Sequence, residues 1–252
     1  MLVRVALNNM NYKYLLFFLT LALSSCGGKV TQADLVTGLV AQIPLNDSAR
    51  ETVSQTTGIM HNVTSISNRH GNASSAMLFT AADSSFIDFG DLPLVSFDAT
   101  AQFTISCWVK LTDTASTMAI LSKRNPTGPF EYCIDNYFNH NGFTLDNWIA
   151  SGATSIYGID PLKAQAPVLP GVWQNLVYVA DGNNLTVYLN GILQSGIDQR
   201  NAGINFSNTD AHFVLGNGGG YGRNYYFNGA IDDVLLYSRA LPLNAIQRLA
   251  QQ

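Results

Sequence analysis

The sequence predicts an all-β domain, a sandwich or a barrel, that ends in one short helix. Three observations predict it: apolar and polar residues alternate repeatedly, turn signals are frequent, and charges are few. Of the 252 residues, 47% are hydrophobic and 12% are charged, which excludes a disordered chain. The formal net charge is −4, so the chain lacks the basic surface that phosphate binding needs, and we expect no nucleic-acid partner.

Residues 1–25 have the pattern of a secretory signal peptide. Arg4 and Lys13 precede the apolar run Tyr14–Leu23, and small residues follow it. A run of about ten residues is too short to span a bilayer, which takes roughly 20. The segment Leu23–Cys26 resembles the bacterial lipobox, in which the peptide is cut before a cysteine that carries lipid. The alternative is an ordinary cleaved signal with an incidental cysteine.

The lipobox resemblance implies that Cys26 is lipidated and that the chain is anchored to a membrane. Residues 26–34 are small or polar, so we expect them to form a short flexible tether. Gly27 after the cysteine, in place of Asp, resembles the sorting pattern of outer-membrane lipoproteins. The expected location is therefore that of a bacterial lipoprotein anchored in the outer membrane.

Strands separated by turns fill most of the remaining chain. The predicted strands are Leu39–Leu45, Ala76–Phe79, Ser85–Phe89, Phe103–Leu111, Met118–Ser122, Phe130–Asp135, Gly142–Leu145, Val172–Ala180, Leu185–Leu189, His212–Gly216 and Ile231–Tyr237. Asp181–Asn184 and Asn190–Gly191 are hairpin turns. An amphipathic helix is expected over Pro242–Ala250, because proline suits the first helical position. No linker divides residues 35–252, so we expect one domain.

Two cysteines lie in predicted strands. Cys107 is in phase with the apolar residues Ile105 and Val109 and should point inward. Cys133 is in phase with Glu131 and should point the opposite way. An exported compartment permits a disulfide, but opposed directions argue against one. We expect two free thiols, one of them buried.

Five segments carry a family resemblance, and they occur in the family's order. They are Phe103–Lys110, Ile120–Lys123, Gly171–Val177, Asp181–Gly191 and Tyr226–Leu241. Together they resemble the laminin-G-like jelly roll of the concanavalin A-like lectin/glucanase superfamily, over essentially all of residues 35–252. The resemblance implies an antiparallel β-sandwich (jelly roll), with binding at a concave face or at loop tips.

The resemblance also implies a structural calcium ion. Related folds often hold Ca²⁺ through the aspartate that corresponds to Asp232 and through residues near the first strand, where Glu51 stands in place of the usual aspartate. Asp232 is in phase with Val234 and Leu236, so we expect it to face the core, where a lone carboxylate needs a partner. The alternative is that backbone N–H groups and Arg239 satisfy it.

Hydrolysis of glycosidic bonds by the family's chemistry is not expected. Laminarinase-type members use an E-x-D-x-x-E strand, and this chain has no such run and only two glutamates, Glu51 and Glu131. Glu131 and Asp135 share one strand face, but at ~3.3 Å per residue their carboxylates lie roughly 13 Å apart, beyond the ~5–9.5 Å that glycosidases use. Hydrolysis by two aspartates from different strands is the alternative that the sequence leaves open.

Aromatic side chains in polar loops form the candidate binding surface. Flat rings stack on sugar faces while amides and charged groups bond the hydroxyls, and the same mixture makes protein interfaces. The alternative for each ring is packing in the fold. The candidates are Tyr137, Phe138, His140, Trp148, Tyr221, Arg223 and Tyr225. We therefore expect a non-catalytic module that binds a glycan or a cell-surface protein, with a structural part in an adhesion or polysaccharide-uptake assembly, or a glycoside hydrolase, as alternatives.

Overall fold

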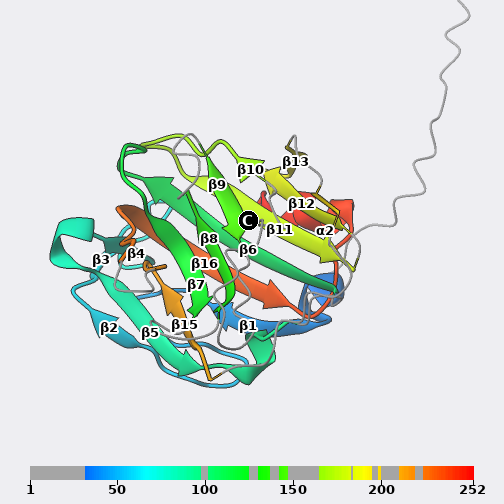
Figure 1. The fold of residues 1–252 in the computed structure, drawn as a ribbon, viewed down its shortest axis with the longest axis horizontal. Coiled ribbons are helices and arrows are strands. Elements are labelled where there is room, and N and C mark those ends of the chain that lie inside the picture. The colour runs from blue at the N-terminus through cyan, green and yellow to red at the C-terminus, as the bar shows by residue number, and fades with distance from the viewer. Residues whose placement is uncertain are drawn as a thin grey trace, which may run out of the picture.

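Two antiparallel β-sheets stack face to face in the computed structural model (Figure 1), so the sandwich prediction is confirmed. The structure describes residues 32–97, 102–124, 130–136, 142–146, 165–182, 184–194, 198–199, 210–218 and 224–252. The predicted signal peptide 1–25, the lipidated Cys26 and most of the tether lie outside these residues. The tether's last residues belong to helix α1 (Gln32–Val36), where the sequence predicted flexible chain.

Nine strands make up the first sheet. They are β1 (Leu39–Ile43), β3 (Thr64–Ile66), β4 (Ala76–Phe79), β6 (Gln102–Leu111), β11 (Gln174–Asp181), β12 (Asn184–Leu189), β13 (Ile192–Leu193), β14 (Asp198–Gln199) and β16 (Gly229–Tyr237). The order is β13-β12-β11-β6-β16-β4-β3, with β1 also paired to β16 and β14 to β12. The longest strand, β6, lies between β11 and β16 and forms the centre of this sheet.

Seven strands make up the second sheet, in the order β10-β9-β8-β7-β15-β5-β2. They are β2 (Ile59–His61), β5 (Phe86–Asp91), β7 (Ala119–Arg124), β8 (Phe130–Asp135), β9 (Phe143–Asp146), β10 (Gln165–Ala166) and β15 (His212–Leu215). Two 3-10 helices, η1 (Ala81–Asp83) and η2 (Pro93–Val95), flank β5. The strands predicted from alternation are all present, within a few residues of their expected ends.

Apolar residues of both sheets fill the space between them. Ile105, Cys107 and Val109 of β6 face Ile87 of β5 and Phe213 of β15 within one continuous core. Such interior burial is the main stabilising contribution to the fold, at about 25 cal/mol per Å² of apolar surface. Each inward residue alternates with one that points to the outer face of its sheet, which therefore carries polar groups.

The outer face of the nine-stranded sheet is partly covered by helix α2 (Leu243–Leu249). Ile246 and Leu249 of α2 pack on Val177 and Val179 of β11, and Leu35 of α1 joins this second apolar cluster. The predicted C-terminal helix is thus confirmed, with Pro242 as its N-cap residue. In the described part of the chain, no helix combines the length and the apolar character needed to cross a membrane.

No disulfide joins Cys107 and Cys133, as expected, and both thiols are buried. Cys107 points into the core. Cys133 points the other way, yet it is covered by Ala119 and Tyr225 on the outer face of the seven-stranded sheet. The alternation of residues along each strand correctly predicted the direction in which each cysteine side chain points. It did not predict that Tyr225, from another segment, covers Cys133.

Candidate functional site

A pocket of about 480 Å³ opens on the outer face of the seven-stranded sheet. Its floor comes from three adjacent strands, β5, β15 and β7, whose outward residues alternate with core residues such as Ile87 and Phe213. The lining residues are Phe86, Asp88, Ser122, Arg124, Asp210, His212, Val214, Asn217, Asn224 and Tyr226. We call this feature the sheet pocket.

Hydrogen bonds fix the floor of the sheet pocket. Ser122 donates through Oγ to the backbone oxygen of Asn217 (2.7 Å), and Arg124 donates through Nη1 to the backbone oxygen of Gly218. On the inner side, Lys123 is fully buried, and its Nζ donates to Ala211 O (2.7 Å) and to Asp91 Oδ1 (2.8 Å). The lining groups are thus held in place before any ligand binds.

Aromatic rings form one wall of the pocket. Phe86 stacks on His61 of β2, with ring centroids 4.1 Å apart and an angle of 13° between the planes. The ring of Tyr226 also lies beside that of Phe86, with centroids 6.2 Å apart. Because His61 supports Phe86 from β2, the two pocket rings, Phe86 and Tyr226, form a braced apolar surface.

Acidic and neutral polar groups accompany these rings. His212 Nδ1 lies 3.0 and 2.9 Å from the two carboxylate oxygens of Asp88, and Gly90 N donates to Asp88 Oδ1 (2.8 Å). The side chain of His212 is 54% exposed and that of Asp88 25% exposed. Asp210 is exposed, whereas Arg124 is buried against Gly218. The sheet pocket therefore offers a ligand two carboxylates, the amides of Asn217 and Asn224, and an aromatic wall.

Most predicted ligand-binding residues lie outside the described residues: Tyr137, Phe138, His140, Trp148, Tyr221 and Arg223. Tyr225 is described, and it is half-buried over Ala119 and Cys133. Its neighbour Tyr226 lines the sheet pocket instead. The stretch that holds Tyr221 and Arg223 is flanked by Asn217 and Asn224, and both of these line the pocket.

Asn136 and Tyr225, which lie near the ends of two segments outside the described residues, both bond to Met118 or Ala119 at the start of β7. Asn136, which precedes Tyr137, accepts from Met118 N through Oδ1 (2.7 Å) and donates from its own N to Met118 O (3.2 Å). Tyr225 accepts from Ala119 N through its backbone oxygen (2.9 Å). The start of β7 thus anchors the chain on both sides, next to the sheet pocket.

Asp232, the first predicted metal ligand, points away from the core. It pairs with Trp108, whose neighbours on β6 are core residues, so it shares the outer face of the nine-stranded sheet. The prediction that it faces the core with Val234 and Leu236 is wrong, because a bulge between Asp232 and Leu235 changes the phase. Asp233 has φ of +44°, and this bulge brings both carboxylates to one side.

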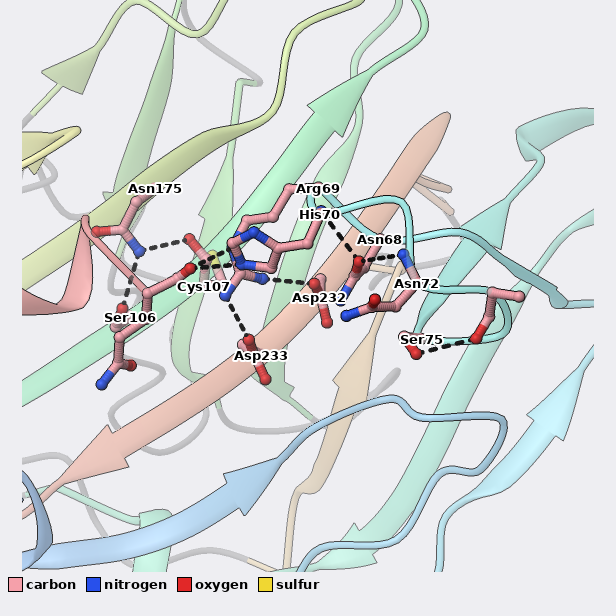
Figure 2. A network of polar contacts seen from close by, with 12 residues as sticks. Asn68, Arg69, His70, Asn72, Ser75, Ser106, Cys107, Asn175, Asp232 and Asp233 are labelled. Atoms are coloured by element: carbon pink, nitrogen blue, oxygen red, sulfur yellow. Dashed lines mark hydrogen bonds and ion pairs between the residues drawn. The ribbon is translucent and has the colours of Figure 1, made fainter.

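Arg69 occupies the space between these two carboxylates (Figure 2). Its Nη1 lies 2.6 Å from Asp232 Oδ2 and its Nη2 lies 2.8 Å from Asp233 Oδ2. The guanidinium carbon lies 4.4 Å from the ring centroid of Trp108, a cation–π contact. Burial first, and the charge of Asp233 second, raise the pKa of Asp232 to about 7, against the lowering effect of Arg69.

A tight turn presents Arg69 at this position. Asn68 accepts through Oδ1 from the backbone N of His70 (3.0 Å) and of Asn72 (3.1 Å), which is an Asx turn. Gly71 takes φ of +80°, which favours glycine. His70 Nε2 lies 2.6 Å from Gln252 O, so the turn is also tied to the end of the described chain.

Glu51, the second predicted metal ligand, is fully buried and held by protein donors. Its Oε1 accepts from Gln42 N (3.0 Å) and Val53 N (2.6 Å), and its Oε2 from the N (2.6 Å) and Oγ of Ser54. Burial alone would raise the pKa of Glu51, but these hydrogen bonds outweigh it and the pKa is lowered.

These contacts do not fit a calcium ion. Calcium takes six to eight oxygens, but the guanidinium of Arg69 covers Asp232 and four donors surround Glu51. Among the described residues, no three His, Cys, Asp or Glu side chains are grouped to hold a metal ion. Arg239, the alternative partner of Asp232, donates instead to the backbone oxygens of Thr37 and Asp34.

Glu131 and Asp135, the nearest approach to a catalytic pair in the sequence, are both buried, and neither lines the sheet pocket. Glu131 Oε1 accepts from Ser96 Oγ (3.2 Å) and lies 3.7 Å from Lys123 Nζ. Two other carboxylates, Asp88 and Asp210, do line the pocket.

Comparisons with known proteins agree with this architecture. A family model described as the concanavalin A-like lectin/glucanases superfamily matches residues 83–247. A search of curated proteins finds no match. Domain 4 of AbnA, a GH43 extracellular arabinanase from Geobacillus stearothermophilus solved with arabinotriose, superposes with a TM-score of 0.60 at 20% identity, covering 84% of this chain and 98% of that domain.

Two further solved structures share the fold. The binding domain of botulinum neurotoxin DC in complex with SialylT gives a TM-score of 0.58 at 12% identity, covering 85% of this chain and 51% of that one. A Trypanosoma rangeli sialidase mutant with trans-sialidase activity gives 0.58 at 15% identity, covering 89% of this chain and 34% of that one. The chain thus spans about half and a third of these two proteins, and at such identities the likeness establishes the fold.

Proposed function

The chain belongs to the concanavalin A-like lectin/glucanase superfamily, and from that premise we propose that it is a non-catalytic glycan-binding module whose ligand lies in the sheet pocket. One observation carries the proposal: Phe86 and Tyr226 form a braced aromatic wall beside polar groups in a pocket of about 480 Å³. Structures of similar fold were solved with arabinotriose and with SialylT, which supports a glycan as the ligand class.

The chemistry of the wall suits a sugar ring. The C–H face of a pyranose or furanose is apolar and flat enough to lie on Phe86 or Tyr226, which bury it from water. The hydroxyls at the ring edge then reach Asp88, Ser122 and the pocket amides, which replace the hydrogen bonds that water provided.

Binding to immobilised arabinan, galactan, xyloglucan and laminarin, followed by calorimetry on the retained glycan, tests the proposal. Phe86→Ala and Tyr226→Ala should each weaken binding at least about fivefold, as expected when a central aromatic contact is removed. Val172→Ala is the matched control, because Val172 is 55% exposed and precedes β11 in the other sheet. Retention of no glycan, or equal losses in all three variants, would overturn the proposal.

Two other outcomes have distinct signatures. Because Asp88 and Asp210 both line the pocket, reducing-sugar release that is lost in Asp88→Asn and Asp210→Asn would make the protein a glycoside hydrolase. Co-purification of a protein partner without glycan retention would instead assign a structural part in a cell-surface assembly.

We also propose that the domain is displayed on a bacterial membrane, in the outer membrane, through lipid on Cys26. The support is the pattern of Arg4, Lys13, the apolar run and Leu23–Cys26. Expression in a Gram-negative host with labelled palmitate should give a labelled protein in the outer-membrane fraction. Cys26→Ser should lose the label, and a labelled variant or an unlabelled parent protein would contradict the anchor.

A further inference from the structure

The charges around the sheet pocket define which glycans it should accept. Three side chains are central: Asp210 is exposed, and His212 pairs through Nδ1 with the partly exposed Asp88. The cation at the pocket, Arg124, is 8% exposed and donates to Gly218 O. Among the described lining residues, the exposed negative charge is thus that of the carboxylates, Asn217 and Asn224 add neutral amides that both donate and accept, and the positive group is largely covered.

The pairing of His212 with Asp88 also fixes which groups of the imidazole a ligand meets. A carboxylate accepts only, so Nδ1 of His212 carries the proton that lies between the ring and Asp88, and this nitrogen is not available to a ligand. Ser122 already donates its hydroxyl proton to Asn217 O, so its Oγ can only accept further bonds. A ligand that complements such a lining must bring donors.

We infer that the sheet pocket selects uncharged, hydroxyl-rich glycans and rejects uronic, sialic and sulfated ones. Sugar hydroxyls can donate to the carboxylates of Asp88 and Asp210, which only accept. A carboxylate or sulfate brings acceptors and a negative charge, and like charges brought together at an interface are strongly unfavourable. This inference rests on the proposed function, because it names the ligand class of the same pocket.

The test compares each neutral glycan with its own anionic derivative. Galactan, xyloglucan and laminarin oligosaccharides are immobilised beside their C6-carboxylate forms, at low salt and neutral pH. We expect the carboxylate form of a bound glycan to bind roughly tenfold more weakly or worse, and the difference to shrink as salt is added. Asp210→Asn should reduce the difference at least about threefold, whereas Asp34→Asn, the same charge change on α1, should leave it unchanged.

Each result of this comparison decides one question. Equal or tighter binding of the carboxylate forms overturns the inference and leaves the glycan-binding proposal standing. A difference that neither salt nor Asp210→Asn reduces also overturns it, because the discrimination would then be steric. Retention of no member of either set counts against the proposed function itself.

Discussion

Replacement of Arg69 by methionine tests what holds the centre of the nine-stranded sheet. Arg69→Met keeps an unbranched stem over Trp108 but removes the guanidinium that lies 2.6 Å from Asp232 and 2.8 Å from Asp233. Asp232 is 1% exposed, so its charge is left buried beside a second carboxylate. Removing one partner of a buried pair costs roughly 3–5 kcal/mol, which lowers Tm by about 6–20 °C in a protein of this size.

Urea unfolding and thermal melts measure this loss, with Arg50→Met as the matched control. Arg50 is exposed and its guanidinium donates to the side chain of Gln55, so its replacement should change stability by no more than about 0.5 kcal/mol. A loss in Arg69→Met as small as that in Arg50→Met would refute the reasoning.

The stability that Arg69→Met loses should be smaller at low pH than at high pH. With Arg69 present, burial and Asp233 raise the pKa of Asp232 to about 7, and the loss of Arg69 removes an effect that lowers this pKa. In Arg69→Met the group is therefore protonated near pH 5 and becomes ionised only at higher pH. Protonation removes the unpaired buried charge, and Arg69→Met should therefore lose less stability at the lower pH. An equal stability loss at both pH values would contradict a change in the protonation of Asp232 between them.

Thermal melts with added Ca²⁺ and with a chelator test the alternative that a calcium ion is the partner of Asp232. If Arg69 fills the place that a cation takes in related folds, neither Ca²⁺ nor a chelator should move the Tm of the parent protein. A ligand that binds only the folded state raises Tm, so a clear rise with Ca²⁺ would support the calcium prediction and count against the ion pair as the sole partner of Asp232.

Three further predictions concern Asp232 itself, one glycine in the core and the two cysteines. The free energy of unfolding should fall as pH rises from about 4 to about 7, because folding raises the pKa of Asp232 and the folded state then binds more protons than the unfolded state. Asp232→Asn should flatten this slope, and an unchanged slope in the variant would contradict the prediction. Gly216→Ala should cost roughly 2–4 kcal/mol in urea unfolding, since its Cβ would lie 2.3 Å from a buried ring at φ +80°, whereas Gly71→Ala has the same φ and open space and should cost only about 1 kcal/mol; similar losses would refute the clash. Both cysteines are buried, and burial raises the pKa of Cys107 to about 12, so Cys107 and Cys133 should resist a thiol reagent until urea is added; rapid labelling of the native protein would contradict the burial.

Alternation along the chain was sufficient to predict the long strands, because each of them buries one face. It did not reveal β2 and β3, which have three residues each and carry partly exposed side chains such as Ile59 and Met60. Such short edge strands have too few inward residues to show a period. The end of the tether was missed for a related reason: α1 is stabilised by Leu35, which packs on the cluster around α2.

Some features of the candidate sites depend on residues that lie far apart in the sequence, and a local pattern cannot predict them. Asp232 was placed on the wrong face because the bulge after it cannot be read from apolar spacing. Its partner Arg69 lies 163 positions earlier in the sequence, and only the pairing of β4 with β16 brings the two together. Phe86 had a usable signal, since it is an aromatic residue out of phase with the core residues Ile87 and Phe89.

We expect the outer face of the nine-stranded sheet to contribute to stability and that of the seven-stranded sheet to bind the ligand, and one pair of variants can test this. The outer face of the nine-stranded sheet is occupied by α2 and by the Arg69 turn, whereas that of the seven-stranded sheet carries the pocket. Sites on opposite faces with no shared partner should act additively. Arg69→Met should thus lower Tm without changing glycan affinity at a temperature where it is folded, whereas Phe86→Ala should weaken glycan binding under the same conditions. Loss of affinity in Arg69→Met under those conditions would mean that the core couples the two faces.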